Sequence, residues 1–127
     1  MVAGNFTIKP VSAKLTRDTD TFSKMDPFCV IIIGNQKQTS SVHKAGGKFP
    51  QWSDAFSFKH TNEGLATIEV WDVDTASAND LVGSGALSLA KFFKGGPEVN
   101  EWVDITYKGK SAGQVLLSIQ FFPASSG

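Results

Sequence analysis

The segment Ile68-Glu69-Val70-Trp71-Asp72-Val73-Asp74 alternates apolar and polar residues and then ends in two carboxylates. Alternation with a period of two is typical of a β-strand that buries one of its faces. Asp72 and Asp74 therefore lie where this strand ends, and residues 75–79 must turn the chain back before Leu81 begins the next apolar run. The segment predicts a strand that is followed by an acidic loop.

Similar patterns recur along the chain at intervals of about ten to fifteen residues, as in β-sandwiches. The predicted strands cover residues 5–11, 27–33, 36–42, 54–59, 66–71, 81–89, 101–107 and 114–122. Gly34-Asn35 predicts a tight hairpin because both residues tolerate a positive φ. A short helical turn is expected over residues 89–94, before Gly95-Gly96-Pro97. We therefore expect an all-β fold, an eight-stranded antiparallel Greek-key β-sandwich.

The composition indicates one ordinary domain. The chain has 127 residues, of which 41% are hydrophobic, and we expect a single domain over residues 1–127 with its core over about 4–123. The longest apolar run, 28–33, is too short to span a membrane, and no signal-peptide pattern precedes it. The single Cys29 cannot form an internal disulfide and is expected to be a buried thiol. These features predict a cytoplasmic protein.

The acidic residues are clustered, although the twelve acids and twelve bases balance. Without Asp20, Asp26, Asp72, Asp74 and Asp80, the remaining residues carry a formal charge of +5. Arg17 is the only Arg, and no polybasic run occurs, which argues against nucleic-acid binding. The chain therefore has a basic body with two acidic stretches.

The two acidic stretches share a spacing. Five residues separate Asp20 from Asp26, and five separate Asp74 from Asp80. If the two loops lie at the same end of a sandwich, the carboxylates converge and repel one another unless cations neutralise them. Calcium suits such a cluster because it takes six to eight oxygen ligands in flexible geometry.

Other interpretations of the carboxylates are weaker. An EF-hand that begins at Asp72 would need Gly and Glu where Ser77 and Gly83 stand. A paired-carboxylate hydrolase would need further catalytic groups, and His43 and His60 are isolated in the sequence. Asp residues in loops also commonly cap turns through their own backbone. We expect that role for Asp18, Asp54 and Asp104, and it remains the alternative for the five clustered residues.

Several motifs together resemble the C2 domain, a β-sandwich that binds phospholipids in a calcium-dependent manner in conventional protein kinase C and synaptotagmins. Met25-Asp26-Pro27-Phe28-Cys29-Val30 is similar to the Ser-Asp-Pro-Tyr-Val motif of the family. The run from Phe49-Pro50-Gln51-Trp52 to Phe58 resembles Asn-Pro-x-Trp-Asn-Glu-x-Phe-x-Phe. Val70-Trp71-Asp72-Val73-Asp74 and Asn79-Asp80-Leu81-Val82-Gly83 complete a match over nearly the whole chain. The resemblance also implies the permuted topology, with the extra strand at the C-terminus.

The resemblance implies a set of calcium ligands. It assigns two or three calcium ions to five bridging carboxylates, with further positions filled by the backbone carbonyls of Thr19 and Val73 and by Ser77. The five carboxylates are those of Asp20, Asp26, Asp72, Asp74 and Asp80. All five acidic positions of the family are therefore present. Ser23 and Met25 depart from the Gly and the Ser or Thr that are usual in the first loop.

The lipid contacts are less well matched to the family. Phe22, with Met25 beside it, is the candidate for insertion into a membrane, and the alternative is that Phe22 packs onto the core. Lys37, Trp71 and Asn79 match the phosphoinositide groove of the family. Phe28, Val30 and Thr39 replace a Tyr and two Lys of that groove, so weak phosphoinositide binding is expected. The basic residues Lys37, Lys44 and Lys48 could each add about 1 kcal/mol if they face a membrane.

Two functions follow from this reading. The first is calcium-dependent binding to anionic phospholipids by a cytoplasmic monomer that moves to the cytoplasmic face of membranes when calcium rises. The alternative is a protein-interaction or scaffold module that binds through the edge at residues 37–48. No nucleophile and base pair or cofactor motif occurs in the sequence, so we expect neither catalytic residues nor an enzyme.

Overall fold

The computed structural model describes residues 3–19, 23–60 and 62–124. Within these residues the chain forms eight strands and one short 3₁₀ helix, η1. The strands are β1 (Gly4–Leu15), β2 (Pro27–Ile33), β3 (Gln36–Thr39), β4 (Phe56–His60), β5 (Leu65–Asp72), β6 (Asp80–Ser88), β7 (Val99–Tyr107) and β8 (Lys110–Pro123), and η1 (Ala90–Phe92) lies between β6 and β7. The prediction of an all-β fold with eight strands is confirmed.

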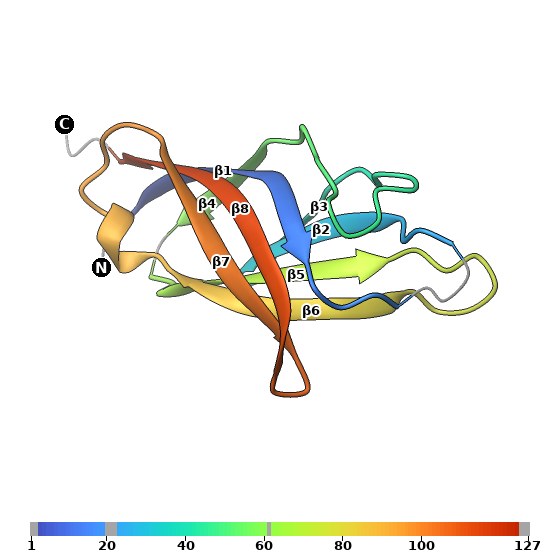
Figure 1. The fold of residues 1–127 in the computed structure, drawn as a ribbon. Coiled ribbons are helices and arrows are strands. Elements are labelled where there is room, and N and C mark those ends of the chain that lie inside the picture. Colours follow the sequence, from blue (N-terminus) through green and yellow to red (C-terminus); the bar gives the residue numbers. More distant parts are fainter. Residues whose placement is uncertain (1–2, 20–22, 61, 125–127) are drawn as a thin grey trace.

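The strands form two layers (Figure 1). Their order is β3-β2-β5-β6-β7-β8-β1-β4, and every pair of neighbours is antiparallel. One register pair, Ser84 with Thr106, joins β6 to β7, so the sheet bends there and separates into β3-β2-β5-β6 and β7-β8-β1-β4. The two layers enclose the hydrophobic core.

The core follows the period-two pattern of the sequence. In β4, Phe56, Phe58 and His60 are buried, whereas Ser57 and Lys59 are exposed. The same alternation buries residues of β5 and β8, including Ile68, Val70, Val115, Leu117, Ile119 and Phe121. Burial of these side chains is the main stabilising contribution, since each fully buried large apolar side chain contributes roughly 1.5–3 kcal/mol.

The two residues that could have carried chemistry in the core are structural. The Cys29 side chain is completely buried, and burial raises the pKa of its thiol well above the ordinary value. His60 is 1% exposed and packs its ring against Phe6, Phe93 and Phe121. A polar contact joins its Nε2 to the backbone carbonyl of Glu63. Neither side chain is accessible to a substrate.

Two turns differ in their backbone conformation. Gly34 has φ +59°, as a type II′ turn requires at its first central position, but Asn35 is not in the positive-φ region, so the expectation for Asn35 was wrong. In the turn between β7 and β8, both Lys108 (φ +50°) and Gly109 (φ +80°) have positive φ. This second turn matches type I′. The predicted turn after β6 is the single 3₁₀ turn η1, and no helix in the described residues is long and apolar enough to cross a membrane.

β3 ends at Thr39, earlier than predicted, because side chains replace the ladder beyond it. The Ser40 hydroxyl accepts a hydrogen bond from the Cys29 N–H (2.8 Å). The Asp54 carboxylate accepts hydrogen bonds from the N–H (3.1 Å) and the hydroxyl (2.9 Å) of Ser41. Asp54 therefore ties two parts of the β3–β4 segment together, and does not cap its own turn as expected.

A glutamine side chain joins the two outermost strands of the sheet. The Gln36 carbonyl accepts a hydrogen bond from the Lys59 N–H (2.8 Å), and the Gln36 amide donates to the Lys59 carbonyl. The side chain therefore links β3 to β4, which lie at opposite ends of the strand order. This contact closes the open side of the sandwich.

Gln36→Ala is expected to lower the free energy of unfolding by about 1–2 kcal/mol, because two hydrogen bonds are lost. Urea denaturation followed by tryptophan fluorescence measures the change. Gln38→Ala, at an exposed position of the same strand, is the matched control and should change stability by less than about 0.5 kcal/mol. Equal stabilities of the two variants would contradict the role of Gln36.

Gly113→Ala is expected to lower the free energy of unfolding by at least about 2 kcal/mol. Gly113 has φ +127°, and a Cβ there would lie 2.1 Å from the Lys14 carbonyl oxygen. Gly64→Ala is the control, since a Cβ at Gly64 meets no atom within 4 Å. Thermal unfolding should separate the two variants, and indistinguishable midpoints would disprove the steric argument.

Candidate functional site

Three loops lie together at one end of the sandwich, opposite the end with both termini (Figure 1). The first connects β1 to β2 over residues 16–26, and the third connects β5 to β6 over residues 73–79. Between them lies the first part of the long β3–β4 connection, residues 40–50. The sequence predicted that the first and third loops would share an end, and the hydrogen bonds described next establish this.

Asp72 connects the first loop to the end of β5. Its carboxylate is 4% exposed, and Oδ1 accepts a hydrogen bond from the Asp26 N–H (2.8 Å). Oδ2 accepts a hydrogen bond from the Thr19 hydroxyl (2.8 Å). The Val73 N–H also donates to the Asp26 carbonyl (3.2 Å). Buried carboxylates require such donors, and here both donors come from the first loop.

Asp26 connects the first loop to the second. Its Oδ1 accepts a hydrogen bond from the Ala45 N–H (2.7 Å), and the Gly47 N–H donates to the Met25 carbonyl (3.0 Å). Ala45 has φ +58°, an uncommon conformation for a residue other than Gly. The positions of the three loops therefore depend on two neighbouring carboxylates.

The third loop is organised around Asp74. The Asp74 Oδ1 accepts a hydrogen bond from the Ala76 N–H (2.9 Å), and its Oδ2 accepts one from the Ser77 hydroxyl (2.9 Å). The Asp74 N–H donates to the Asn79 side-chain oxygen (3.0 Å). Asp80 begins β6 and is the ladder partner of Asp72. Asp74 and Asp80 are both partly exposed and accessible to ions.

The structure brings four of the five predicted ligands, Asp26, Asp72, Asp74 and Asp80, to the same end of the sandwich. Asp20 lies outside the described residues. Among the residues that are described, no three His, Cys, Asp or Glu side chains are arranged to hold a metal ion. Several of the carboxylate oxygens instead accept hydrogen bonds from loop N–H and hydroxyl groups.

The donors present fit a hard cation. Every candidate ligand atom at this end is an oxygen, from a carboxylate, a hydroxyl or a backbone carbonyl, which is the donor type that calcium prefers. Thr19 and Ser77 already contact the carboxylates of Asp72 and Asp74 through their hydroxyls. The ligand roles of the Thr19 and Val73 carbonyls remain predictions.

Met25 does not reach the surface. Its side chain is fully buried in the core, and its sulfur accepts a hydrogen bond from the Thr19 N–H (3.4 Å). The expectation that Met25 inserts into a lipid surface is therefore wrong in this structure, because Met at this position fills the space beneath the first loop. Phe22, the other candidate for insertion, lies outside the described residues.

Sequence reasoning missed Phe49, which at 69% is the most exposed large hydrophobic residue in the described part of the chain. It lies in the second loop, directly before Pro50. The signal was available in the motif that begins at Phe49, because Phe stands where the resembling pattern has Asn. An apolar side chain in that position has no reason to be exposed for folding.

The groove formed by β2, β3 and β5 is real but weakly charged. Its volume is about 290 Å³, and its lining residues are Phe28, Val30, Lys37, Thr39, Trp71, Ala78 and Asn79. Lys37 is the only cation among these described lining residues. The Trp71 indole N–H donates to the Glu69 carboxylate (3.0 Å), which places an anion beside the groove. The predicted residues are together, but their charges do not favour a polyphosphate.

Two other expected roles are now clear. Asp104 lies within β7 and accepts a hydrogen bond from the Gln114 side chain (2.8 Å), so the expectation that it caps a turn was wrong. The His43 Nδ1 accepts a hydrogen bond from the Gln51 N–H (2.9 Å) and so stabilises the second loop. Lys44 and Lys48 are both exposed on that loop.

Comparison with known proteins gives a consistent result. The C2 domain family matches residues 4–105. Elicitor-responsive protein 3 of Oryza sativa subsp. japonica is 28% identical over 124 residues, which cover 97% of this chain and 86% of that protein.

Solved structures show the same fold. A C2 domain of plant extended synaptotagmin 1 superposes with a TM-score of 0.85 at 18% identity, over 99% of both chains. The two calcium-bound C2 domains of extended synaptotagmin 2 give a TM-score of 0.80 at 23% identity, covering 97% of this chain and 47% of that one. At these identities the likeness establishes the architecture.

Asp72→Asn is expected to lower the free energy of unfolding by about 1–3 kcal/mol, because an amide cannot accept both hydrogen bonds of a buried carboxylate. Asp74→Asn removes the same charge at a more exposed position and should change stability by less than about 0.5 kcal/mol. Urea denaturation in the presence of a chelator compares the two variants. Equal losses would show that Asp72 does not hold the first loop in place.

Proposed function

Since the chain belongs to the C2 domain family, we propose that it binds anionic phospholipid membranes in a calcium-dependent manner. The observation that carries this proposal is the joining of three loops through Asp26 and Asp72, with Asp74 and Asp80 at the same end. A buried carboxylate at a surface end of a sandwich, surrounded by further carboxylates, is costly for folding alone. Its retention is explained if the cluster serves to bind cations.

The residues proposed to hold two or three calcium ions are Asp20, Asp26, Asp72, Asp74 and Asp80, the backbone carbonyls of Thr19 and Val73, and Ser77. Bound calcium would supply positive charge and open coordination positions for oxygens of lipid headgroups. The loop end holds its ligands without calcium through N–H and hydroxyl donors. The ligand oxygens would exchange these donors for the cation.

Charge gives the proposed calcium dependence. The five carboxylates carry a formal charge of −5 alone, of −1 with two calcium ions and of +1 with three. An anionic leaflet repels the first state within the Debye length of about 8 Å at physiological salt. Because calcium and lipid would each favour the binding of the other, their affinities must be coupled by the same factor.

Basic residues near the loops would add to the attraction. Lys37, Lys44 and Lys48 are exposed, and each could contribute about 1 kcal/mol near an anionic surface. Trp71 and Asn79 line the groove with Lys37, but Glu69 beside them weakens any preference for phosphoinositides. Phe22 remains a candidate for membrane insertion.

We further propose that residues 1–127 act as one C2 domain, with a core over about 4–123, that is monomeric and has no catalytic function. In this proposal the protein is cytoplasmic and moves to the cytoplasmic face of membranes when calcium rises. Its partner would be a lipid surface, with no role for nucleic acid.

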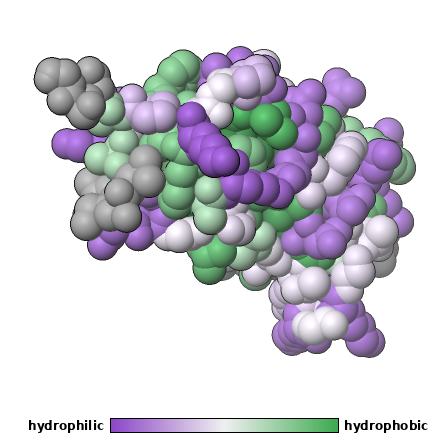
Figure 2. Space-filling model, turned by 90° about the vertical axis from the view of Figure 1, so that its left-hand side faces the viewer, coloured by the Kyte–Doolittle hydropathy of each residue, from purple (hydrophilic) through white to green (hydrophobic). Residues whose placement is uncertain are grey.

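A second candidate function is a protein-interaction module. The end that carries the termini exposes Leu65 (59%) and Phe122 (48%), and Figure 2, which faces this end, shows apolar surface between polar patches. Exposed apolar surface of this kind is found at protein interfaces. A partner could bind there with or without calcium.

Replacement of Asp74 and Asp80 by Asn together is expected to abolish calcium-dependent sedimentation with vesicles that contain phosphatidylserine. Both side chains are partly exposed, so the loss would reflect ion binding more than folding. The control with the same charge change is Glu98→Gln with Asp104→Asn, which lie on the β7 side of the sandwich, away from the loops. Wild-type protein should bind only with calcium and only to anionic vesicles.

Two results would contradict the proposal. Vesicle binding by the Asp74 and Asp80 variant that equals that of the wild type would remove the carboxylates from the mechanism. Absence of vesicle binding by the wild type in any condition would favour the interaction module.

A further inference from the structure

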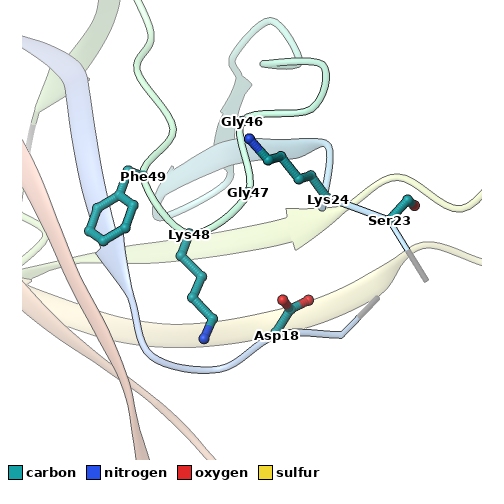
Figure 3. Close-up of a pocket in the computed structure, with 7 residues that line it drawn as sticks. All are labelled: Asp18, Ser23, Lys24, Gly46, Gly47, Lys48 and Phe49. Atoms are coloured by element: carbon teal, nitrogen blue, oxygen red, sulfur yellow. The ribbon is translucent and has the colours of Figure 1, made fainter. Parts of the chain in front are cut away.

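A second pocket lies beside the proposed calcium site, between the first and second loops (Figure 3). Its volume is about 340 Å³, within the range of small-molecule sites. Its lining residues are Asp18, Ser23, Lys24, Gly46, Gly47, Lys48 and Phe49. Only Lys48 among them belongs to the lipid contacts expected from the sequence.

Backbone hydrogen bonds build this pocket in advance of any ligand. The Leu15 N–H donates to the Lys48 carbonyl (2.8 Å), which fixes the second loop to β1. The Gly47 N–H donates to the Met25 carbonyl (3.0 Å), and the Phe49 N–H donates to the Gly46 carbonyl (3.3 Å). The pocket is therefore formed by two loops that are bonded to each other, and a ligand would not have to order them.

Two glycines form the floor and leave room for a lysine chain. Gly47 has φ +62°, and a Cβ there would lie 3.7–3.8 Å from the aliphatic carbons of Lys24. The Lys24 chain therefore crosses Gly47 in van der Waals contact. A Cβ at Gly46 would lie 2.8 Å from the His43 ring, so this position also excludes a side chain.

Two ammonium groups and one carboxylate border the pocket. Figure 3 shows the Lys48 ammonium extending toward Asp18 and the Lys24 ammonium lying beside Gly46. The described lining has a formal charge of +1, in contrast to the acidic cluster next to it. The exposed ring of Phe49 lies at the rim, so a cationic pocket and an apolar side chain share one surface.

We propose that this pocket binds the phosphate of an anionic phospholipid headgroup in a membrane, through Lys24 and Lys48, without the participation of calcium. The proposal rests on the proposed function, since it adds a second contact to the same membrane-binding end. Two features favour a membrane lipid over free phosphate. The pocket adjoins the loops that would face the bilayer, and Phe49 offers an apolar contact that inorganic phosphate cannot use.

Asp18 sets the strength of this site. Its carboxylate borders the same space as the two ammonium groups and would repel a phosphate. Asp18→Asn is therefore expected to raise the affinity for a phospholipid headgroup. A gain in binding is informative because misfolding of the variant cannot produce it.

The first experiment is an NMR titration of the full chain in chelator with monomeric dihexanoylphosphatidylserine. Saturable shifts of the Gly46 and Gly47 amide signals are expected. The shifts should be lost in the variant Lys24→Gln with Lys48→Gln, and Asp18→Asn should lower the dissociation constant about threefold or more. Amide signals that do not move, or that move equally in the double variant, would overturn the proposal.

Inorganic phosphate and dihexanoylphosphatidylcholine complete the titration. Weak or absent saturation by either agrees with an anionic phospholipid as the ligand. Saturation by inorganic phosphate at the same concentration as by the lipid would overturn the assignment to a membrane lipid, and Phe49→Ser should then have no effect. Under the proposal, Phe49→Ser weakens binding to vesicles.

Vesicle sedimentation tests the contribution at a membrane. The Lys24 and Lys48 variant should lose about tenfold in partitioning onto phosphatidylserine vesicles with calcium, as expected for two basic contacts. The control Lys59→Gln with Lys94→Gln removes the same charge at exposed positions of β4 and beyond η1, and should lose less than twofold. Equal losses in the two variants would overturn the proposal.

The two proposals can fail separately. If the wild type shows no calcium-dependent vesicle binding but its Gly46 and Gly47 signals still respond to the lipid, the calcium mechanism fails and the pocket stands. If vesicle binding needs calcium but these signals never respond, the pocket fails and the calcium mechanism stands.

Discussion

The loop end of this protein depends on one buried carboxylate. Asp72 lies at the end of β5, where the strand ladder stops, and its two oxygens accept hydrogen bonds from the Asp26 N–H and the Thr19 hydroxyl. Asp26, positioned in this way, accepts the Ala45 N–H of the second loop. A sequence of two carboxylates therefore transmits the position of a core strand to two surface loops. The same carboxylates belong to the proposed calcium site, so the group that positions the loops is also one that a cation would contact.

Most of the fold could be predicted because burial imposes a period of two on each strand. Phe56 and Phe58, or Val115 and Leu117, identify their strands without any knowledge of the partners. The strand ends were less predictable, because side chains decide them. β3 stops where the Ser40 hydroxyl takes the place of a backbone acceptor, and Asp54 bonds to Ser41 before β4 begins. Such long-range contacts leave no periodic signal in the sequence.

The candidate site was predictable in its acidic residues but less so in its apolar ones. Matched spacing and position at strand ends placed Asp26, Asp72, Asp74 and Asp80 at the same end of the fold. Met25 was expected at the surface because its neighbours in the sequence are loop residues, but the core beneath the loop needed a large apolar side chain. Phe49 was overlooked because it stands inside a motif whose other residues are buried or structural. Exposure of an apolar residue depends on the space around it, which sequence patterns do not describe.

The contact between Gln36 and Lys59 also has a consequence for association between molecules. The outermost strands of a sheet present N–H and carbonyl groups that can pair with a strand of another chain, and such pairing leads to aggregation. In this sandwich both backbone groups of Lys59 are occupied by the Gln36 side chain of the same molecule. A protein that concentrates on a membrane surface brings its copies close together, where exposed edges would be most hazardous. By occupying that edge from within, Gln36 would allow dense coverage of a bilayer by separate molecules.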